Sequence, residues 1–178
     1  THTFNKGELT TEGGIVTLSD IEWTASSATY ISWDNNNGRG IQLGSKNILN
    51  PTYQLSTSAL AGCTIRSITV NSSKANSGDA ELTISVGSQT SEAYTLGTSD
   101  AAYTFDCEDT TGNISINWTA TDRAYYVKSI IIVKLSDINA LIEKLDNDIL
   151  AFNKKIERKE FIENELPKQQ EKLNTANK

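Results

Sequence analysis

The sequence changes character abruptly near residue 135. All eleven glycines lie before this point, and residues 136–178 contain none. Of the first 135 residues, 37 are Ser or Thr, whereas 17 of the last 43 are charged. Thr and turn-forming residues are typical of short strands, and a glycine-free stretch rich in Lys, Glu, Leu and Ile is typical of helix. We therefore expect two domains, a β domain over 1–135 and a helical tail over 136–178.

Apolar and polar residues alternate in many short segments of the first part. Leu82, Ile84 and Val86 alternate with polar residues, and segment 114–118 repeats the pattern. Segment 125–133 is apolar almost throughout, as expected of a central strand covered on both faces. These patterns predict strands near residues 3–6, 14–18, 21–25, 28–33, 39–43, 52–57, 64–71, 80–87, 92–96, 102–106, 113–119 and 125–134. Many short strands with little helix between them predict a mainly β fold, an antiparallel β-sandwich of jelly-roll-like type.

The tail carries apolar residues with the 4-3 spacing of a coiled-coil-type α-helix. This apolar seam consists of Ile138, Ile142, Leu145, Ile149, Phe152 and Ile156. We expect a helix over 136–165, a break at Pro167 and a short second helix after it, because proline is tolerated in the first turn of a helix. An isolated helix is marginal in water, so the seam must pack on the β domain, a second copy of the chain or a partner helix.

Composition narrows the classes of function. The net charge of −6 argues against binding to nucleic acid or to anionic membranes, and no apolar run is long enough to insert into a bilayer. The first residues show no signal peptide, so any such segment would have been removed or never existed. The chain has one histidine and no nucleophile elbow, P-loop or dinucleotide fingerprint. Asp20 and Glu22 could serve acid–base chemistry only across a cleft, so we predict that the protein is not an enzyme.

Three segments carry a resemblance to a known group of modules. They are 32–45 (S-W-D-N-N-N-G-R-G-I-Q-L-G-S), 64–71 (T-I-R-S-I-T-V-N) and 124–132 (A-Y-Y-V-K-S-I-I-I). Over about residues 1–134 the chain resembles accessory β-sandwich modules of secreted and surface proteins of gut Bacteroidetes and Firmicutes. This resemblance implies a non-catalytic module at a secreted or cell-surface location. The sequence departs from the pattern at 48–50 and by its two cysteines.

One loop combines an aromatic residue with many hydrogen-bonding groups. A glycan site needs a flat apolar face together with amides and a charged group that bind sugar hydroxyls. The candidate residues are Trp33, Asp34, Asn35, Asn36, Asn37 and Arg39. The alternative is that Trp33 belongs to the core, while the polar residues only turn the chain and Arg39 holds the loop. The loop could also hold calcium, but EF-hand spacing is absent and carboxylates are few, so we predict no metal and no cofactor.

Other residues allow two interpretations each. Trp23, Tyr30 and Trp118 could form a second stacking platform or lie in the core. The acidic turn 106–109 could bind a cation or be a solvated turn. Cys63 and Cys107 flank predicted strands, so they could form a disulfide or remain free thiols.

Two functions follow as hypotheses. The first is a binding or adhesion module of an exported bacterial protein, with a carbohydrate or another cell-surface ligand. The alternative is a structural module of a stalk, fibre or complex, in which residues 138–156 mediate oligomerisation or docking to a partner helix.

Overall fold

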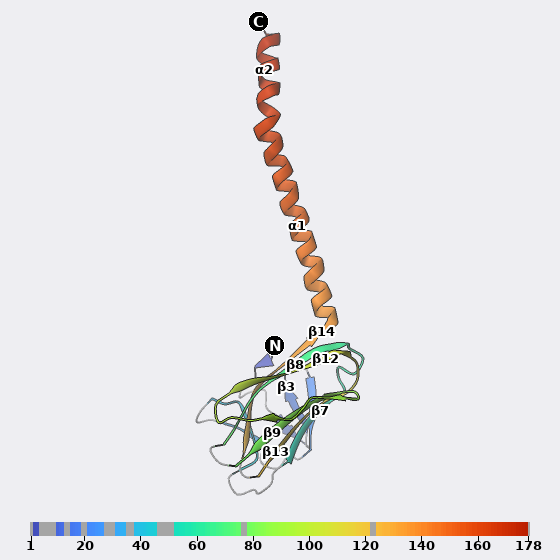
Figure 1. Cartoon of the computed structure of the whole chain (residues 1–178), viewed down its shortest axis with the longest axis vertical. Helices are drawn as coiled ribbons and strands as arrows, with labels where there is room; N and C mark the ends of the chain where they lie inside the picture. Colours follow the sequence, from blue (N-terminus) through green and yellow to red (C-terminus); the bar gives the residue numbers. More distant parts are fainter. Residues whose placement is uncertain are drawn as a thin grey trace. The chain divides into compact units, whose positions relative to one another are not determined.

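The computed structural model describes residues 2–3, 10–12, 15–18, 21–26, 31–34, 38–45, 52–75, 78–121 and 124–177. The chain divides into two compact units, Thr1–Leu135 and Ser136–Lys178. The first unit, here called the β domain, contains two antiparallel sheets that form two layers (Figure 1). The predicted mainly β, antiparallel fold is confirmed.

The first sheet contains the three longest strands side by side, with one of them at its edge. Its order is β12 (Ala101–Thr110), β8 (Ile65–Lys74), β14 (Tyr125–Lys134), β6 (Ile41–Leu43) and β5 (Ile31–Trp33), and β1 (His2–Thr3) also pairs with β14. Tyr125, Val127 and Ile130 on β14 are buried, whereas Ile131 and Val133 are only half-buried. The prediction that this whole strand is covered was therefore wrong at its end. Beyond Val127 the strand has lost its neighbour β6, and among the described residues only β1 replaces it.

The second sheet is built mainly from shorter strands. Its order is β10 (Gln89–Thr90), β9 (Ala80–Val86), β13 (Ile114–Ala120), β7 (Thr52–Thr57), β4 (Ile21–Ala25), β3 (Ile15–Leu18) and β2 (Thr10–Glu12), and β11 (Tyr94–Thr95) also pairs with β9. Strands β2 and β10 were not among the predicted strands. They contain three residues and two residues, which is too short for a recognisable period.

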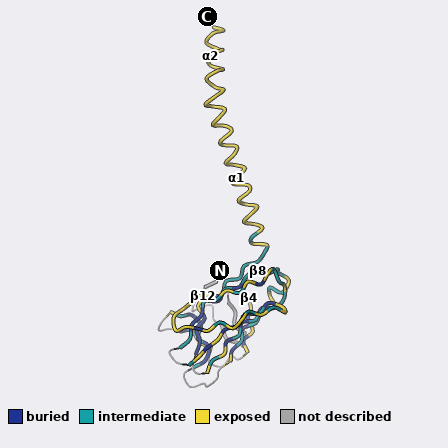
Figure 2. The backbone as a smooth tube through the Cα atoms, in the orientation of Figure 1, coloured by how far each residue is buried: buried dark blue, intermediate teal, exposed yellow. Residues whose placement is uncertain are grey.

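Alternation along the strands builds the core between the two sheets. Leu82, Ile84 and Val86 of β9 are buried and lie opposite Trp118, Ile116 and Ile114 of β13. Buried side chains of the first sheet, including Ile68 and Val70 of β8, belong to the same apolar cluster. Figure 2 shows these buried segments inside the β domain. Because successive side chains of a strand point to opposite faces of the sheet, every second side chain fills the core and those between them face water.

Strand β12 is longer than predicted because it contains a bulge. The sequence analysis placed a strand at 102–106, whereas the observed strand continues to Thr110. The pairing with β8 shifts between Asp106 and Thr110, and Glu108 and Asp109 adopt positive φ angles of 48° and 60°. A bulge adds unpaired residues without ending the strand, so the acidic turn lies inside the strand rather than after it.

The second unit is helical. Helix α1 spans Leu135–Asn164, and α2 spans Leu166–Ala176. Pro167 lies in the first turn of α2, and backbone hydrogen bonds from Glu165 N to Phe161 O and from Gln169 N to Glu165 O continue the helical path across the junction. The observed bounds of α1 differ by one residue at each end from the predicted helix. None of the described residues of α1 and α2 is buried (Figure 2).

Candidate functional site

The candidate loop connects β5 to β6. Gly38 and Gly40 adopt φ angles of +63° and +89°, which glycine reaches at little steric cost. A Cβ on Gly40 would lie 2.3 Å from the carbonyl oxygen of Val127. The loop therefore returns to β6 directly against the backbone of β14, and only a glycine fits at this contact.

Asp34 and Arg39 close the base of the loop. Arg39 Nε lies 3.1 Å from Asp34 Oδ2, and the backbone N–H of Asp34 donates to the carbonyl of Gly40 at 2.9 Å. The guanidinium of Arg39 lies over the ring of Tyr126, with Cζ 3.6 Å from the ring centroid. Asp34 is only 6% exposed, and an ion pair with a guanidinium offsets part of the cost of burying its carboxylate. Arg39 thus has the loop-holding role that the sequence analysis gave as the alternative.

Trp33 differs from the other two tryptophans. It is half-buried and packs against the edge of the core, whereas Trp23 and Trp118 are 2% and 0% exposed. The hypothesis that Trp23 and Trp118 form a second stacking platform is therefore wrong, because both belong to the core. Tyr30 lies outside the described residues, as do Asn35, Asn36 and Asn37.

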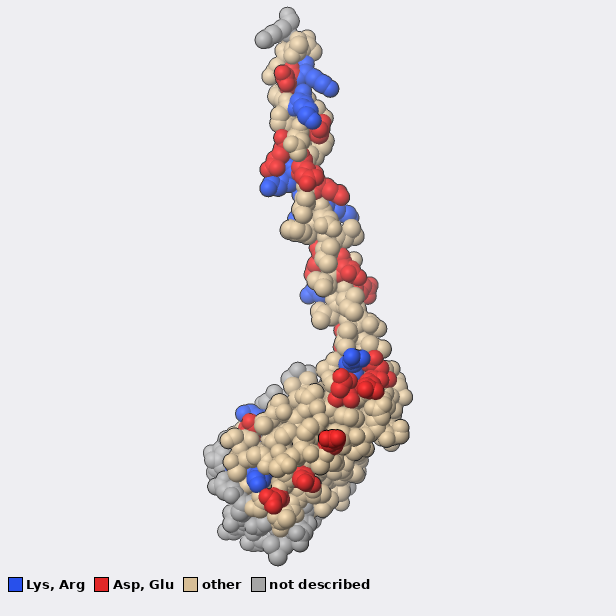
Figure 3. Space-filling view, in the orientation of Figure 1, with Lys and Arg blue, Asp and Glu red and all other residues tan. Residues whose placement is uncertain are grey.

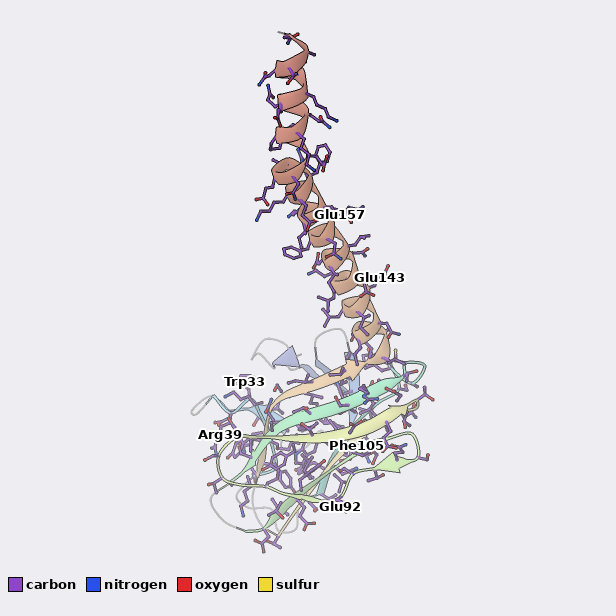
Figure 4. The ribbon with its side chains drawn as sticks, turned by 45° about the horizontal axis from the view of Figure 1, so that its top comes forward. Trp33, Arg39, Glu92, Phe105, Glu143 and Glu157 are labelled. Atoms are coloured by element: carbon purple, nitrogen blue, oxygen red, sulfur yellow. The ribbon has the colours of Figure 1, made fainter. Side chains whose placement is uncertain are left out.

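Figure 4 places Trp33 and Arg39 on one side of the β domain. On the face shown in Figure 3, the β domain carries a cluster of acidic side chains at one end and scattered charged side chains elsewhere. The described part of the candidate site therefore offers a partly accessible indole beside a held guanidinium.

Two of the three carboxylates of the acidic turn make contacts at the bulge, one within it and one with the neighbouring strand β8. Asp106 Oδ1 accepts a hydrogen bond from the backbone N–H of Glu108 at 3.1 Å, and Asp109 Oδ2 lies 3.0 Å from Arg66 Nη1. No group of three His, Cys, Asp or Glu residues in the described part of the chain is arranged to hold a metal ion. These contacts fit a structural bulge.

The two cysteines are free thiols in the structure. Cys107 is buried in the core, and its Sγ lies 3.7 Å from the carbonyl oxygen of Phe105. Burial, with a smaller contribution from the carboxylate of Asp106, raises the pKa of Cys107 to about 11. A thiol is nucleophilic as its thiolate, so Cys107 is poorly suited to covalent chemistry near neutral pH.

Two further surfaces of the β domain escaped the sequence analysis. Tyr94 and Tyr103 stand 5.6 Å apart between ring centroids, and the Tyr94 hydroxyl donates to the carbonyl of Thr104 at 2.6 Å. Together with Phe105 they are half-buried and pack against the core beside the edge strand β12. The aromatic residues at 103 and 105 share one face of a strand, and this spacing is the signal that could have indicated them.

The second surface is a hollow of about 330 Å³ where β9 begins and β13 ends. It is lined by Asp79, Glu81, Thr119, Ala120 and Thr121. Backbone and side-chain hydrogen bonds between Asp79 and Thr121 hold its two sides together. No sequence signal marks this hollow, because its sides come from segments about 40 residues apart.

Comparisons with known proteins connect the chain to solved structures. No protein-family model matches the sequence, and no curated protein matches it. The structure of TmCBM61 in complex with β-1,4-galactotriose aligns with a TM-score of 0.50 and 10% identity, over 75% of this chain and 99% of that one. The carbohydrate-binding module CBM36, in complex with calcium and xylotriose, aligns at a TM-score of 0.44 and 18% identity, over 64% and 94%.

A family two carbohydrate esterase from Cellvibrio japonicus aligns at a TM-score of 0.36 and 11% identity, over 63% of this chain and 32% of that one. At these identities the TmCBM61 match shows a shared β-sandwich fold. In the described part of the chain, neither helix is long and apolar enough to cross a membrane.

Proposed function

We propose that residues 1–135 form a non-catalytic binding module for a carbohydrate or another cell-surface ligand, within an exported protein. One observation carries this proposal: Trp33 alone of the three tryptophans is partly accessible, and it ends strand β5 directly before the loop whose base the Asp34–Arg39 pair holds. Sugars present C–H faces that pack on an indole ring, and their hydroxyls bind charged and amide groups beside it. The three asparagines that follow Asp34 in the sequence are the expected amide donors.

The contacts at the base of the loop support a binding role. A site whose side chains are already fixed loses little conformational entropy when a ligand binds. Gly40, the Asp34–Arg39 ion pair and the Tyr126 ring each restrict the described base of this loop. The shared fold with TmCBM61, which was solved with β-1,4-galactotriose, makes neutral β-linked oligosaccharides the first probes to use.

The test is titration of the chain with β-1,4-galactotriose and with xylotriose, followed by calorimetry and tryptophan fluorescence. Because Trp23 and Trp118 are buried, a spectral change would report on Trp33. We expect Trp33→Ala to weaken binding by about tenfold or more, as at other aromatic anchor residues. Phe105→Ala is the control, since Phe105 is half-buried on β12, at the other end of the first sheet from β5. Equal binding by wild type and Trp33→Ala would refute the assignment of the ligand to this loop.

A second candidate function rests on the helical unit. The side chains of the apolar seam from Ile142 to Ile156 are 41–62% exposed. Such a row of exposed apolar residues is typical of an interaction surface. We propose, as the alternative function, that residues 138–156 assemble this chain with itself or with a partner helix. Light scattering that gives the same monomeric mass for residues 1–178 and for a chain ending at Leu135 would exclude self-assembly.

A further inference from the structure

We propose that residues 138–156 of α1 bind the same residues of a second copy of this chain, as a parallel, in-register, two-stranded coiled coil. This inference deepens the assembly function proposed above and rests on it. It does not depend on the carbohydrate-binding proposal. Three observations carry it: the residue types in the apolar seam, the charges on both sides of the seam, and the point where the seam ends.

The residue types in the seam favour two parallel strands. In a heptad labelled abcdefg, Ile142, Ile149 and Ile156 occupy a positions. Ile138, Leu145 and Phe152 occupy d positions. β-branched residues at a, combined with leucine at d, favour parallel dimers over higher oligomers. Here every a position of the seam is β-branched, and its central d position is leucine.

The seam lies on one uninterrupted helix. Helix α1 has 30 residues, which corresponds to a length of about 45 Å. Its six seam residues are all at least partly exposed, and Phe152 reaches 62%. Burying these side chains against a second seam removes apolar surface from water, which is the main driving force for association of soluble helices.

The charges beside the seam disfavour an antiparallel pair. In an antiparallel coiled coil, e positions face e positions and g positions face g positions. The antiparallel register that covers all six seam residues pairs Ile142 with Phe152 and Leu145 with Ile149. At the centre of that register, Asp146 would face Asp146 of the second copy, and Asp148 would face Asp148. Facing like charges are destabilising, so this arrangement concentrates four carboxylates at its centre.

The same charges are compatible with a parallel pair. In a parallel coiled coil, each g position faces the e position of the following heptad in the other strand. Lys155 at g would then face Glu160 at e of the second copy, and the two-fold symmetry creates this pair twice. Asp148 would face Asn153, which can donate a hydrogen bond to a carboxylate. The parallel register therefore places opposite charges together and separates the aspartates.

Beyond Ile156, charged residues occupy the heptad a and d positions that apolar residues occupy within the seam. Lys159 and Glu163 occupy the next d and a positions, and they form an ion pair within the helix at 3.7 Å. Two charged residues in succession would be costly in a coiled-coil core. The apolar core of the interface therefore covers residues 138–156, and charged residues of the next heptad flank its end. A parallel dimer of this kind joins two β domains to the same end of the coiled coil, so two weak ligand sites could act together.

A cysteine at residue 159 distinguishes the two directions. In the parallel dimer, Lys159→Cys of one copy lies beside Lys159→Cys of the other, and mild oxidation should link the chains. In the antiparallel register covering all six seam residues, the two cysteines would stand about 36 Å apart along the axis and could not bridge. Lys154→Cys is the matched control, because residue 154 is at position f on the outer face. The wild-type protein, oxidised in the same way, shows how much cross-linking occurs through Cys63 or Cys107.

The strength of association tests the interface residues. We expect sedimentation of the full chain to show a dimer, and Ile149→Asp to raise its dissociation constant at least tenfold. Lys155→Glu should weaken the dimer by about threefold to tenfold, and adding Glu160→Lys should restore it. Lys155→Glu also creates a favourable Glu–Lys spacing with Lys159 inside the helix, so a weaker dimer would not reflect loss of helix.

The outcomes separate the possible failures. A dimer that links through residue 159 and responds to both charge changes supports the proposal. A dimer that links no better through residue 159 than through residue 154 refutes the parallel direction but keeps self-assembly. A trimer refutes the two-stranded arrangement. A monomer at 100 µM refutes self-association altogether and leaves the carbohydrate test unaffected.

Discussion

Trp118 of the second sheet donates a hydrogen bond from its indole Nε1 to the hydroxyl of Ser72 in the first sheet, at 3.1 Å. Ser72 in turn donates to the carbonyl oxygen of Tyr126 at 2.7 Å. Both Ser72 and Trp118 are completely buried. A single hydroxyl therefore satisfies a buried indole N–H and joins β13 to two neighbouring strands of the opposite sheet, β8 and β14.

We predict that Ser72→Ala destabilises the β domain by about 1–3 kcal/mol, because it leaves the buried N–H of Trp118 without a partner. Urea unfolding, monitored by circular dichroism, measures the change. Ser85→Ala is the control: Ser85 bonds to Thr90 at the surface, so its loss should cost less than about 0.5 kcal/mol. If the two substitutions reduced the free energy of unfolding equally, the buried hydrogen bond between Trp118 and Ser72 would contribute little to stability.

Gly40 and Gly38 offer a matched pair of glycines in one loop. We predict that Gly40→Ala costs more than about 2 kcal/mol, since the new Cβ collides with Val127 O and Lys128 Cα in addition to the strain of a positive φ. Gly38→Ala meets nothing within 4 Å and should cost only about 1 kcal/mol for its backbone conformation. Thermal unfolding of both variants tests the difference, and the prediction fails if Gly38→Ala is the more damaging.

Removing Arg39 should reveal what its ion pair contributes to the stability of the nearly buried Asp34 carboxylate. We expect Arg39→Ala to reduce the free energy of unfolding at pH 7 by about 1–3 kcal/mol, because Asp34 loses its ion pair and Tyr126 loses the stacked guanidinium. Lys128→Ala is the comparison, since the Lys128–Asp100 pair is longer, at 3.4 Å, and more exposed. That change should cost no more than about 1 kcal/mol. Arg39→Lys should restore only part of the loss, because an ammonium does not stack as a guanidinium does.

Cys107 should resist thiol reagents in the folded protein. Its pKa of about 11 leaves on the order of one thiolate in a thousand at pH 8, and its side chain is inaccessible. We expect a disulfide-exchange reagent at pH 8 to titrate one thiol, Cys63, in the native state and two thiols after unfolding in urea. Rapid reaction of two thiols per chain in the native protein would contradict this prediction.

The same pKa predicts how stability depends on pH. The folded state holds the thiol proton more tightly than the unfolded state, whose thiol titrates near its ordinary value. The contribution of Cys107 is therefore complete below about pH 8 and is lost as pH rises through 9 to 11. Cys107→Ala should unfold with a shallower decline in stability over this range than wild type.

Much of the architecture could be predicted from local pattern. The alternation at Leu82, Ile84 and Val86 requires a strand with one buried face, whatever its neighbours are, and β9 has that face buried. The glycine-free tail likewise favours helix residue by residue, and the structure contains α1 and α2 there. The alternation and the helical composition are both local features of a few neighbouring residues, so they can be recognised without knowledge of the rest of the chain.

The candidate site depended on contacts that no local pattern contains. Trp23, Trp33 and Trp118 all lie in short strands, yet two are in the core and one is accessible, because the outcome depends on which strands of the opposite sheet cover them. The Asp34–Arg39 pair sits against Tyr126, a residue of a strand far along the chain. Periodicity is a property of neighbouring residues and specifies the elements. Burial and charge pairing arise between segments distant in the sequence, and so they become defined only when the two sheets pack.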